Sequence, residues 1–231
     1  MFGTDGGRKR FRHKFEGEMK KLAFALLTLV ILAGCTSEAP QSPPKPQPPE
    51  LLTGRSAFQQ LYIAAHGWAG DARPYQLQST AVTDANGRDG KAGIWRAAFA
   101  SGAVHKSKPF SWVGVDLSDA PARGVSPGTE DNYTPGNDFD INFLKVDSDK
   151  AFEEAQKHGG DKILSDDPKL PVAYLLDWNR GGGNLVWHVI YGNSRNDAKQ
   201  VIDVDATTGA FLRKENSYIT PVPRSAGRKR A

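Results

Sequence analysis

Apolar side chains recur at helical spacing in two segments of the chain. In residues 54–66, Phe58, Leu61 and Ala65 fall on one face at intervals of three and four residues, which predicts an amphipathic helix. A second, shorter helix is predicted at residues 148–158, where an acidic residue lies in the first turn and a Gly-Gly pair follows the last turn.

After each predicted helix, the pattern changes to the alternation that is typical of strands. Each half of the chain is therefore predicted to form one helix and a three-stranded antiparallel meander. One such unit has a thin core, so the two units are expected to pack together into an α+β fold. The predicted strands cover residues 75–83, 94–101, 110–117, 172–178, 185–191 and 199–204.

A third apolar segment, residues 22–33, has no polar face and is interrupted only by Thr28. About a dozen apolar residues are too few for a bilayer span, which needs roughly 20, but they suit the core of a signal peptide. Two lysines, Lys20 and Lys21, precede this segment, and Leu32-Ala33-Gly34-Cys35 ends it. The ending resembles the lipobox of bacterial lipoproteins.

The lipobox resemblance implies cleavage between Gly34 and Cys35 and a diacylglyceryl group on the Cys35 sulfur, so membrane lipid is a predicted partner. A secretory signal with a chance cysteine, or an uncleaved anchor, is the alternative. Thr36 stands where lipoproteins of the enteric inner membrane carry Asp, which favours an outer-membrane anchor facing the periplasm. Residues 1–18 are interpreted as an upstream start before Met19 or as a basic leader that is removed.

Composition divides the chain into five predicted segments. Residues 1–34 are the leader and signal peptide, and residues 35–50 are the lipidated cysteine and a linker that contains six prolines. The linker favours extended polyproline II, so it is interpreted as a stalk of roughly 45 Å rather than a recognition motif. The remaining predicted segments are a first α+β unit at 51–140, a second at 141–218, and a basic disordered tail at 219–231.

Charge distribution argues against a nucleic-acid partner. The chain has 30 basic and 26 acidic residues. Seven of these basic and three of these acidic residues lie in residues 1–34, which leaves 23 of each sign after cleavage. Four of the remaining basic residues lie in the tail, so the folded part lacks the basic surface that phosphate binding needs. The single cysteine is assigned to the lipid, so no disulfide is expected.

The second half contains a strand that begins Trp187-His188-Val189 and a later turn, Val204-Asp205-Ala206-Thr207-Thr208-Gly209. This pattern resembles the PepSY domain, a small α+β module with a W-x-V strand and a V-D-A-x-T-G turn. Asp205 and Thr207 are expected to bond the backbone of their own turn, and Gly209 to adopt a left-handed conformation. Residues 210–213 can then pair back as a short strand.

The resemblance implies a function in binding, because PepSY modules are thought to bind or restrain peptidases and have no known catalytic residues. An envelope protein or peptide is therefore a predicted partner. Trp187, Asp205, Thr208 and Gly209 form the signature and have a structural role. The first half is at most a degenerate copy, since Trp95 leads a strand but the T-G turn is absent.

No catalytic or metal-binding motif accompanies these features, so neither enzymatic activity nor a cofactor or metal is predicted. Asp131, Asp138 and Asp140 are candidate binding residues for calcium or a cationic partner, with a solvated acidic loop as the alternative. Two further hypotheses remain open. One is an envelope hydrolase whose site is assembled from Asp138, Asp140 and His188, and the other is a structural envelope component.

Overall fold

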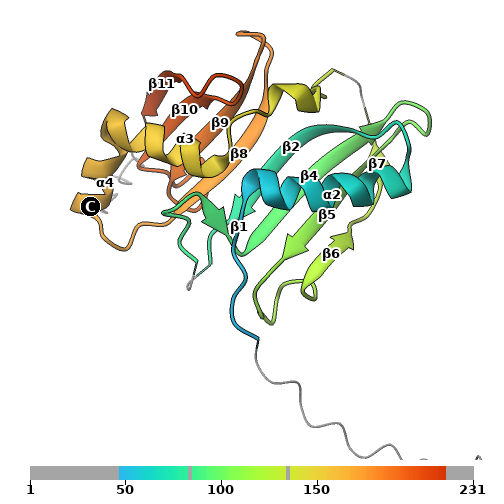
Figure 1. The fold of residues 1–231 in the computed structure, drawn as a ribbon, viewed down its shortest axis with the longest axis horizontal. Helices are drawn as coiled ribbons and strands as arrows, with labels where there is room; N and C mark the ends of the chain where they lie inside the picture. The colour runs from blue at the N-terminus through green and yellow to red at the C-terminus, as the bar shows by residue number, and fades with distance from the viewer. Residues whose placement is uncertain (1–46, 83–84, 134–135, 217–231) are drawn as a thin grey trace, which may run out of the picture. The chain divides into compact units, whose positions relative to one another are not determined.

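The computed structural model describes residues 47–82, 85–133 and 136–216, which belong to one compact unit that begins at Pro46. These residues form an α+β fold in which helices pack against a large antiparallel sheet (Figure 1). No helix among them is both long and apolar enough to cross a membrane. The predicted leader, signal peptide and basic tail, including Gly34 and Cys35, lie outside the described residues.

The first half consists of one long helix and a meander of four strands. Helix α2 (Gly54–Trp68) buries the apolar face that the sequence predicts, including Phe58, Leu61 and Ala65. Each strand of the meander is antiparallel to the next. The strands are β2 (Arg73–Thr80), β4 (Ile94–Ser101), β5 (Lys106–Val113) and β6 (Gly124–Pro127), with β1 (Leu52–Thr53) paired to β3 (Lys91–Ala92) and β7 (Asp131–Asn132) paired to β5.

The second half has the same order of elements. A 3₁₀ turn (Ile141–Phe143) leads into helix α3 (Ser148–Ala155), which continues through a π-helical segment (Gln156–Gly160) into α4 (Asp161–Asp166). Four antiparallel strands follow. They are β8 (Val172–Asn179), β9 (Asn184–Tyr191), β10 (Gln200–Asp205) and β11 (Phe211–Asn216).

The prediction of three strands was wrong for the first meander, because β6 completes it to four. In the second meander, the return predicted at residues 210–213 is the fourth strand, β11. The β6 sequence, GVSP, contains Gly and Pro and has no hydrophobic alternation. Strand β11 is longer than the short return expected at residues 210–213. The second helix also extends beyond its predicted end: the chain kinks at Gly159, where φ is 103°, and then resumes as α4.

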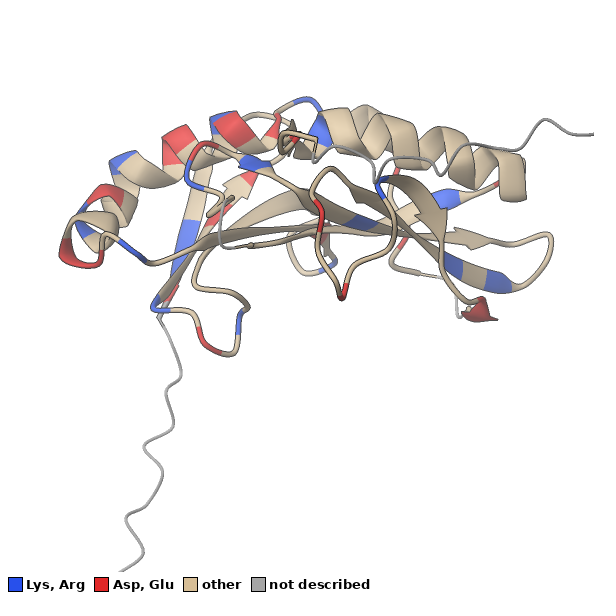
Figure 2. Ribbon diagram, turned by 90° about the horizontal axis from the view of Figure 1, so that it is seen from below, with Lys and Arg blue, Asp and Glu red and all other residues tan. Residues whose placement is uncertain are grey.

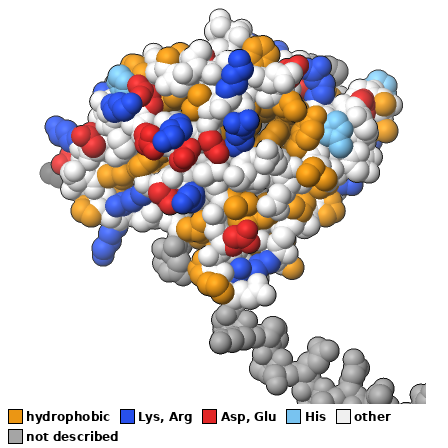
Figure 3. Space-filling view, in the orientation of Figure 1, with side chains coloured by type: hydrophobic (Ala, Val, Ile, Leu, Met, Phe, Trp, Pro, Cys, Tyr) orange, Lys and Arg blue, Asp and Glu red, His pale blue; other side chains and the backbone are white. Residues whose placement is uncertain are grey.

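The two meanders join into one sheet through their first strands, β2 and β8. These strands pair antiparallel, with Leu77 opposite Leu176, so neither first strand remains an edge. The strand order is β11-β10-β9-β8-β2-β4-β5-β6. Helices α2 and α3 lie on the same face of this sheet (Figure 2), which we call the helix face, and we call the opposite side the open face. The surface seen in Figure 3 carries side chains of both charges, interspersed with hydrophobic ones.

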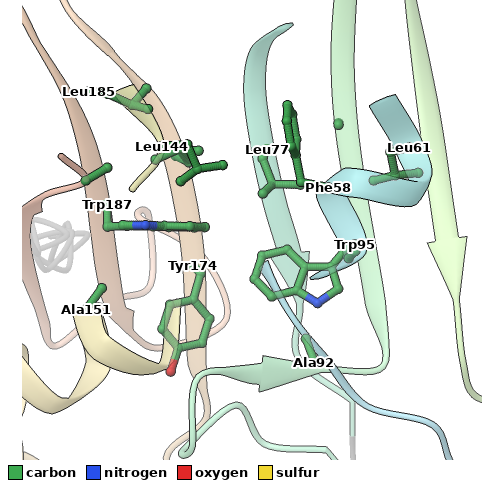
Figure 4. Close-up of a cluster of buried hydrophobic side chains, with 14 of the residues drawn as sticks. Phe58, Leu61, Leu77, Ala92, Trp95, Leu144, Ala151, Tyr174, Leu185 and Trp187 are labelled. Atoms are coloured by element: carbon green, nitrogen blue, oxygen red, sulfur yellow. The ribbon is translucent and has the colours of Figure 1, made fainter. Parts of the chain in front are cut away.

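Two tryptophans make equivalent contacts in the two halves. Trp95 on β4 donates its indole N–H to the carbonyl of Leu52 (2.8 Å), and Trp187 on β9 donates to Val146 (2.9 Å). In each half, the accepting carbonyl belongs to the residue just before the helix cap. The two rings are fully buried and meet edge to face with centroids 6.3 Å apart, as Figure 4 shows. The indoles therefore attach each helix to its own meander and join the halves to one another.

The N-termini of α2 and α3 share one carboxylate, that of Asp147. One oxygen accepts hydrogen bonds from the amides of Arg55 (2.8 Å) and Ser148 (2.7 Å), and the other accepts from the Thr53 hydroxyl (2.7 Å). Helix N-termini carry partial positive charge and unpaired N–H groups. One negative charge thus stabilises both helix starts where they meet.

Replacing Asp147 with alanine should destabilise both helix starts. A single capping residue contributes about 1 kcal/mol, and we expect a loss of about 2 kcal/mol in the free energy of unfolding here. Chemical denaturation measures this loss. Asp140→Ala is the matched control, because Asp140 caps only the three-residue 3₁₀ turn. Equal losses in the two variants would contradict the shared cap.

Candidate functional site

A group of charged side chains converges on the open face of the second meander. His188 on β9 lies between two carboxylates: its Nε2 is 3.0 Å from Asp177 on β8, and its Nδ1 is 2.5 Å from Asp203 on β10. The second oxygen of Asp203 accepts from Arg213 on β11 at 2.8 Å. Arg195, from the β9–β10 loop, approaches the same histidine. We call these five residues the His188 cluster.

The centre of the His188 cluster is buried although it lies on the open face. The side chains of His188 and Asp203 are 4% and 1% exposed, whereas Asp177 is 35% exposed. Removing a charge from water is costly unless the charge is paired and hydrogen bonded. In this cluster, each buried charged group has a partner of opposite charge, and the cluster meets solvent through Arg213, Arg195 and Asp177.

The two carboxylates control the protonation of His188. Burial alone would lower the pKa of His188, but hydrogen bonds to Asp177 and Asp203 and the attraction of both charges raise that pKa above its ordinary value. Burial likewise acts to raise the pKa of Asp177, but its hydrogen bond to His188 and the positive charges of His188 and Arg195 together outweigh burial and lower that pKa. The cluster therefore favours an imidazolium between two carboxylates.

Arg195 gives the cluster a second hydrogen-bonding arrangement. Its Nη2 lies 2.5 Å from Nδ1 of His188. When Nδ1 carries a proton, it donates to Asp203 and cannot accept from a guanidinium. When the ring is neutral with its proton on Nε2, Nδ1 accepts from Arg195 instead. The charge of His188 thus determines which partner Nδ1 has.

A polar row extends from the His188 cluster across the open face. The strand register places His188 beside Leu175, then Gln78 on β2, Arg96 on β4 and Ser111 on β5. Exposure is greatest at Arg96, whereas Gln78 and Ser111 are half-buried. The row is therefore polar on both sides of Leu175, which lies at the junction of the two meanders, and Arg96 is its exposed cation.

The signature turn predicted in the second half has a defined geometry. One oxygen of Asp205 accepts from the amides of Thr207 (2.9 Å) and Thr208 (2.8 Å), and Gly209 has a φ of 78°. The Thr207 hydroxyl, however, donates to the carbonyl of Phe143. The expectation that it bonds its own turn was wrong. It is the Thr208 hydroxyl that bonds within the turn, accepting from the amide of Ala210 at 3.3 Å.

The acidic candidates Asp131, Asp138 and Asp140 each have a separate structural partner. Asp131 lies on β7 and accepts from the amide of Asn132. Asp138 pairs with Arg73 at 2.8 Å, and Asp140 caps the 3₁₀ turn. Within the described residues, no three His, Cys, Asp or Glu side chains are grouped to hold a metal ion. No hydrogen bond or ion pair there joins either Asp138 or Asp140 to His188.

Sequence reasoning identified His188 but missed its partners. A usable signal was present, because Asp177 and Asp203 each interrupt an apolar strand on the side opposite its large apolar residues. Charged residues at such positions in three neighbouring strands predict a buried ionic group, provided that the strand order is known. The order β8-β9-β10 follows from the meander.

Comparison with known proteins gives one structural likeness. No protein-family model matches the chain, and no curated protein matches it at a significant level. A solved structure of a candidate lipoprotein from Clostridium difficile 630 is similar, with a TM-score of 0.45 and 12% sequence identity. The likeness covers 69% of this chain and 91% of that one.

Proposed function

We propose that the protein is a lipoprotein of the bacterial cell envelope that is anchored through Cys35 and acts as a non-enzymatic binding module. The observation that carries this proposal is the sequence Leu32-Ala33-Gly34-Cys35, which directly ends an apolar run of signal-peptide length. Thr36 after the cysteine supports an outer-membrane anchor with the folded unit in the periplasm.

The open face is the proposed binding surface. The helix face is already covered by α2 and α3, whereas the polar row crosses the open face with Arg96 exposed in it. The strand edges are poorer sites. Strand β6 is short and contains Pro127, and the exposed residues of β11 include Arg213 and Lys214. Prolines and charged side chains discourage the addition of another strand.

The proposal includes a tandem PepSY-like organisation with an envelope protein or peptide, such as a peptidase, as partner. The equivalent contacts of Trp95 and Trp187 with the carbonyls before their helices support two related units. A binding role is favoured over a hydrolase because Asp138, Asp140 and His188 serve separate structural partners.

Replacing Cys35 with alanine should abolish incorporation of a fatty-acid probe such as labelled palmitate, because the thiol is the only attachment point for the lipid. The measurement is metabolic labelling followed by envelope fractionation. Ser37→Ala, two residues away, is the matched control and should label normally. Equal labelling of the Cys35→Ala variant would show that the anchor assignment is wrong.

The binding surface can be tested with a photoreactive amino acid placed on either face of the lipidated protein. A crosslinker at Arg96 is expected to capture an envelope protein or peptide. A crosslinker at Ile63, which is 73% exposed on α2, is not. Capture from both positions, or from Ile63 alone, would argue against the open face. Failure at both positions with folded protein would favour a structural component.

A further inference from the structure

The β9–β10 loop, residues 192–199, covers an apolar part of the open face. In the strand register, Ile190 on β9 lies between Ala173 on β8 and Val201 on β10. These three side chains are only 2–5% exposed, and Ala198 of the loop packs with them. We call Ala173, Ile190 and Val201 the covered row. The loop therefore hides apolar surface that the open face would otherwise present.

The covered row lies directly beside the His188 cluster. Ile190 is two residues from His188 along β9, so both side chains are on the same face of the sheet. The row ends at Glu215 on β11, which is opposite Val201. Arg195 of the loop reaches both places, because its Nη2 is 2.5 Å from Nδ1 of His188 and its Nη1 is 3.6 Å from Glu215. One side chain of the loop thus joins the ionic cluster to the end of the covered row.

The loop has internal bonds that do not depend on the protonation of His188. The carboxylate of Asp197 accepts from the amide and the hydroxyl of Ser194, both at 2.7 Å, and from the side chain of Asn193 at 3.1 Å. The hydrogen bond from Ser194 is the main cause that lowers the pKa of Asp197, so this carboxylate stays charged where an imidazole titrates. At the start of the loop, the amide of Gly192 donates to the carbonyl of Pro171 at 2.9 Å. The loop tip can therefore leave the sheet without losing its own turn.

The charge of His188 decides whether Arg195 can stay beside it. The charged groups around this imidazole come from β8, β10, the loop and β11, and they are Asp177, Asp203, Arg195, Arg213 and Glu215. A protonated ring presents an N–H at Nδ1 and a positive charge, and a guanidinium has only N–H donors and the same charge. The two groups then repel each other. Glu215 remains as the partner of Arg195.

We propose that Arg195 and His188 form a pH-dependent latch, in which neutral His188 accepts from Arg195 and holds the loop over the covered row, whereas protonated His188 donates to Asp203 and releases the loop tip. Release leaves Arg195 with Glu215 and presents the covered row to solvent beside the polar row. Because hydrogen bonds to the two carboxylates and their charges raise the pKa of His188 against the effect of burial, release is expected to begin above pH 6.5, roughly the ordinary value for imidazole. The open face thereby gains apolar surface as the pH falls.

The test is nuclear magnetic resonance of the full chain labelled with ¹⁵N, recorded from about pH 9 down to about pH 5.5, a range that brackets imidazole titration. The ring nitrogens of His188 report its protonation, and the backbone amide of Asn196, which is exposed at the loop tip, reports the order of the loop. The order parameter of Asn196 should fall from about 0.85, typical of rigid backbone, to below about 0.6. The midpoint of this fall should equal the midpoint of the His188 titration.

Arg195→Gln should leave the loop tip mobile at every pH, because the latch has lost its cation. The side chain of Arg195 is 39% exposed, so the fold should tolerate this change. Lys199→Gln is the matched control: it removes another cation of the same loop, one that pairs with Asp167 at 2.6 Å, and it should keep the transition. The proposal is overturned if the order of Asn196 does not change with pH, if its midpoint differs from that of His188, if Arg195→Gln keeps the transition, or if Lys199→Gln loses it.

Discussion

Replacing Trp187 with alanine is expected to lower the free energy of unfolding by about 3–5 kcal/mol, the range for removing a large buried aromatic side chain. The ring is fully buried and contacts Trp95 and Tyr174 edge to face. It also packs closely on the start of α2, where a Cβ at Gly54 would lie only 2.5 Å from the ring. Loss of this ring removes contacts in both halves, and chemical denaturation measures the effect.

Trp178→Ala is the matched control for Trp187→Ala. Trp178 is on the neighbouring strand β8, but it is only half-buried and its ring contact is with Phe143, at 5.2 Å. We expect a clearly smaller loss there, because less apolar surface leaves water on folding. If both variants lost the same stability, Trp187 would not be the link between the halves.

Replacing Asp203 with asparagine is expected to cost about 3–5 kcal/mol, because it breaks the buried ion pair with His188 and leaves that imidazolium with Asp177 alone of the two carboxylates that flank it. Asp203 is 1% exposed and holds His188 with one oxygen and Arg213 with the other. Asp167→Asn is the matched control. Asp167 pairs with Lys199 at the surface, where an ion pair contributes about 0–1 kcal/mol. If Asp203→Asn lost no more free energy of unfolding than Asp167→Asn, the ionic character of the cluster would be contradicted.

The His188 cluster also predicts how stability depends on pH. Because the pKa of His188 is raised in the folded state, its contribution is complete below the unfolded value of about 6.5 and is lost as pH rises through the folded value. The pKa of Asp177 is lowered, so its contribution is present above about 3.9 and is lost as pH falls through the folded value. Stability attributable to the cluster should therefore be greatest between these limits.

The free energy of unfolding should be measured from below the lower limit to well above the upper one. In His188→Asn, its decline on the alkaline side should be flatter than in the parent protein. His105→Asn is the control, since His105 is exposed in the β4–β5 turn with a φ of 52° that asparagine tolerates. An unchanged alkaline limb in His188→Asn would assign the pH dependence to other groups.

Strands with strong alternation were predictable, and short polar strands were not. The predicted strand at residues 94–101 has the bounds of β4, because its large apolar residues alternate along one face of a half-buried strand. Strands β6 and β7 are four and two residues long and mostly exposed. Such strands are specified by the neighbouring strand β5, which sequence periodicity does not report.

The candidate site was predictable only in part for a related reason. His188 was visible as a polar residue in an apolar strand, but its partners are 11 and 15 residues away on other strands. The acidic residues near Asp138 appeared to be a group in the sequence because they are close in number. In the fold, Asp138 pairs with Arg73, and the carboxylate of Asp140 accepts a hydrogen bond from the amide of Asn142.

By itself, the sequence determined the α+β class, the two helices and the six main strands, and it predicts a lipid anchor, because each depends on local periodicity or on a contiguous motif. Only the tertiary structure decided the pairing of β2 with β8, the shared cap at Asp147 and the His188 cluster. These features join residues that are distant along the chain. Which charges, caps and strand edges become partners depends on the surfaces that meet when the two halves pack.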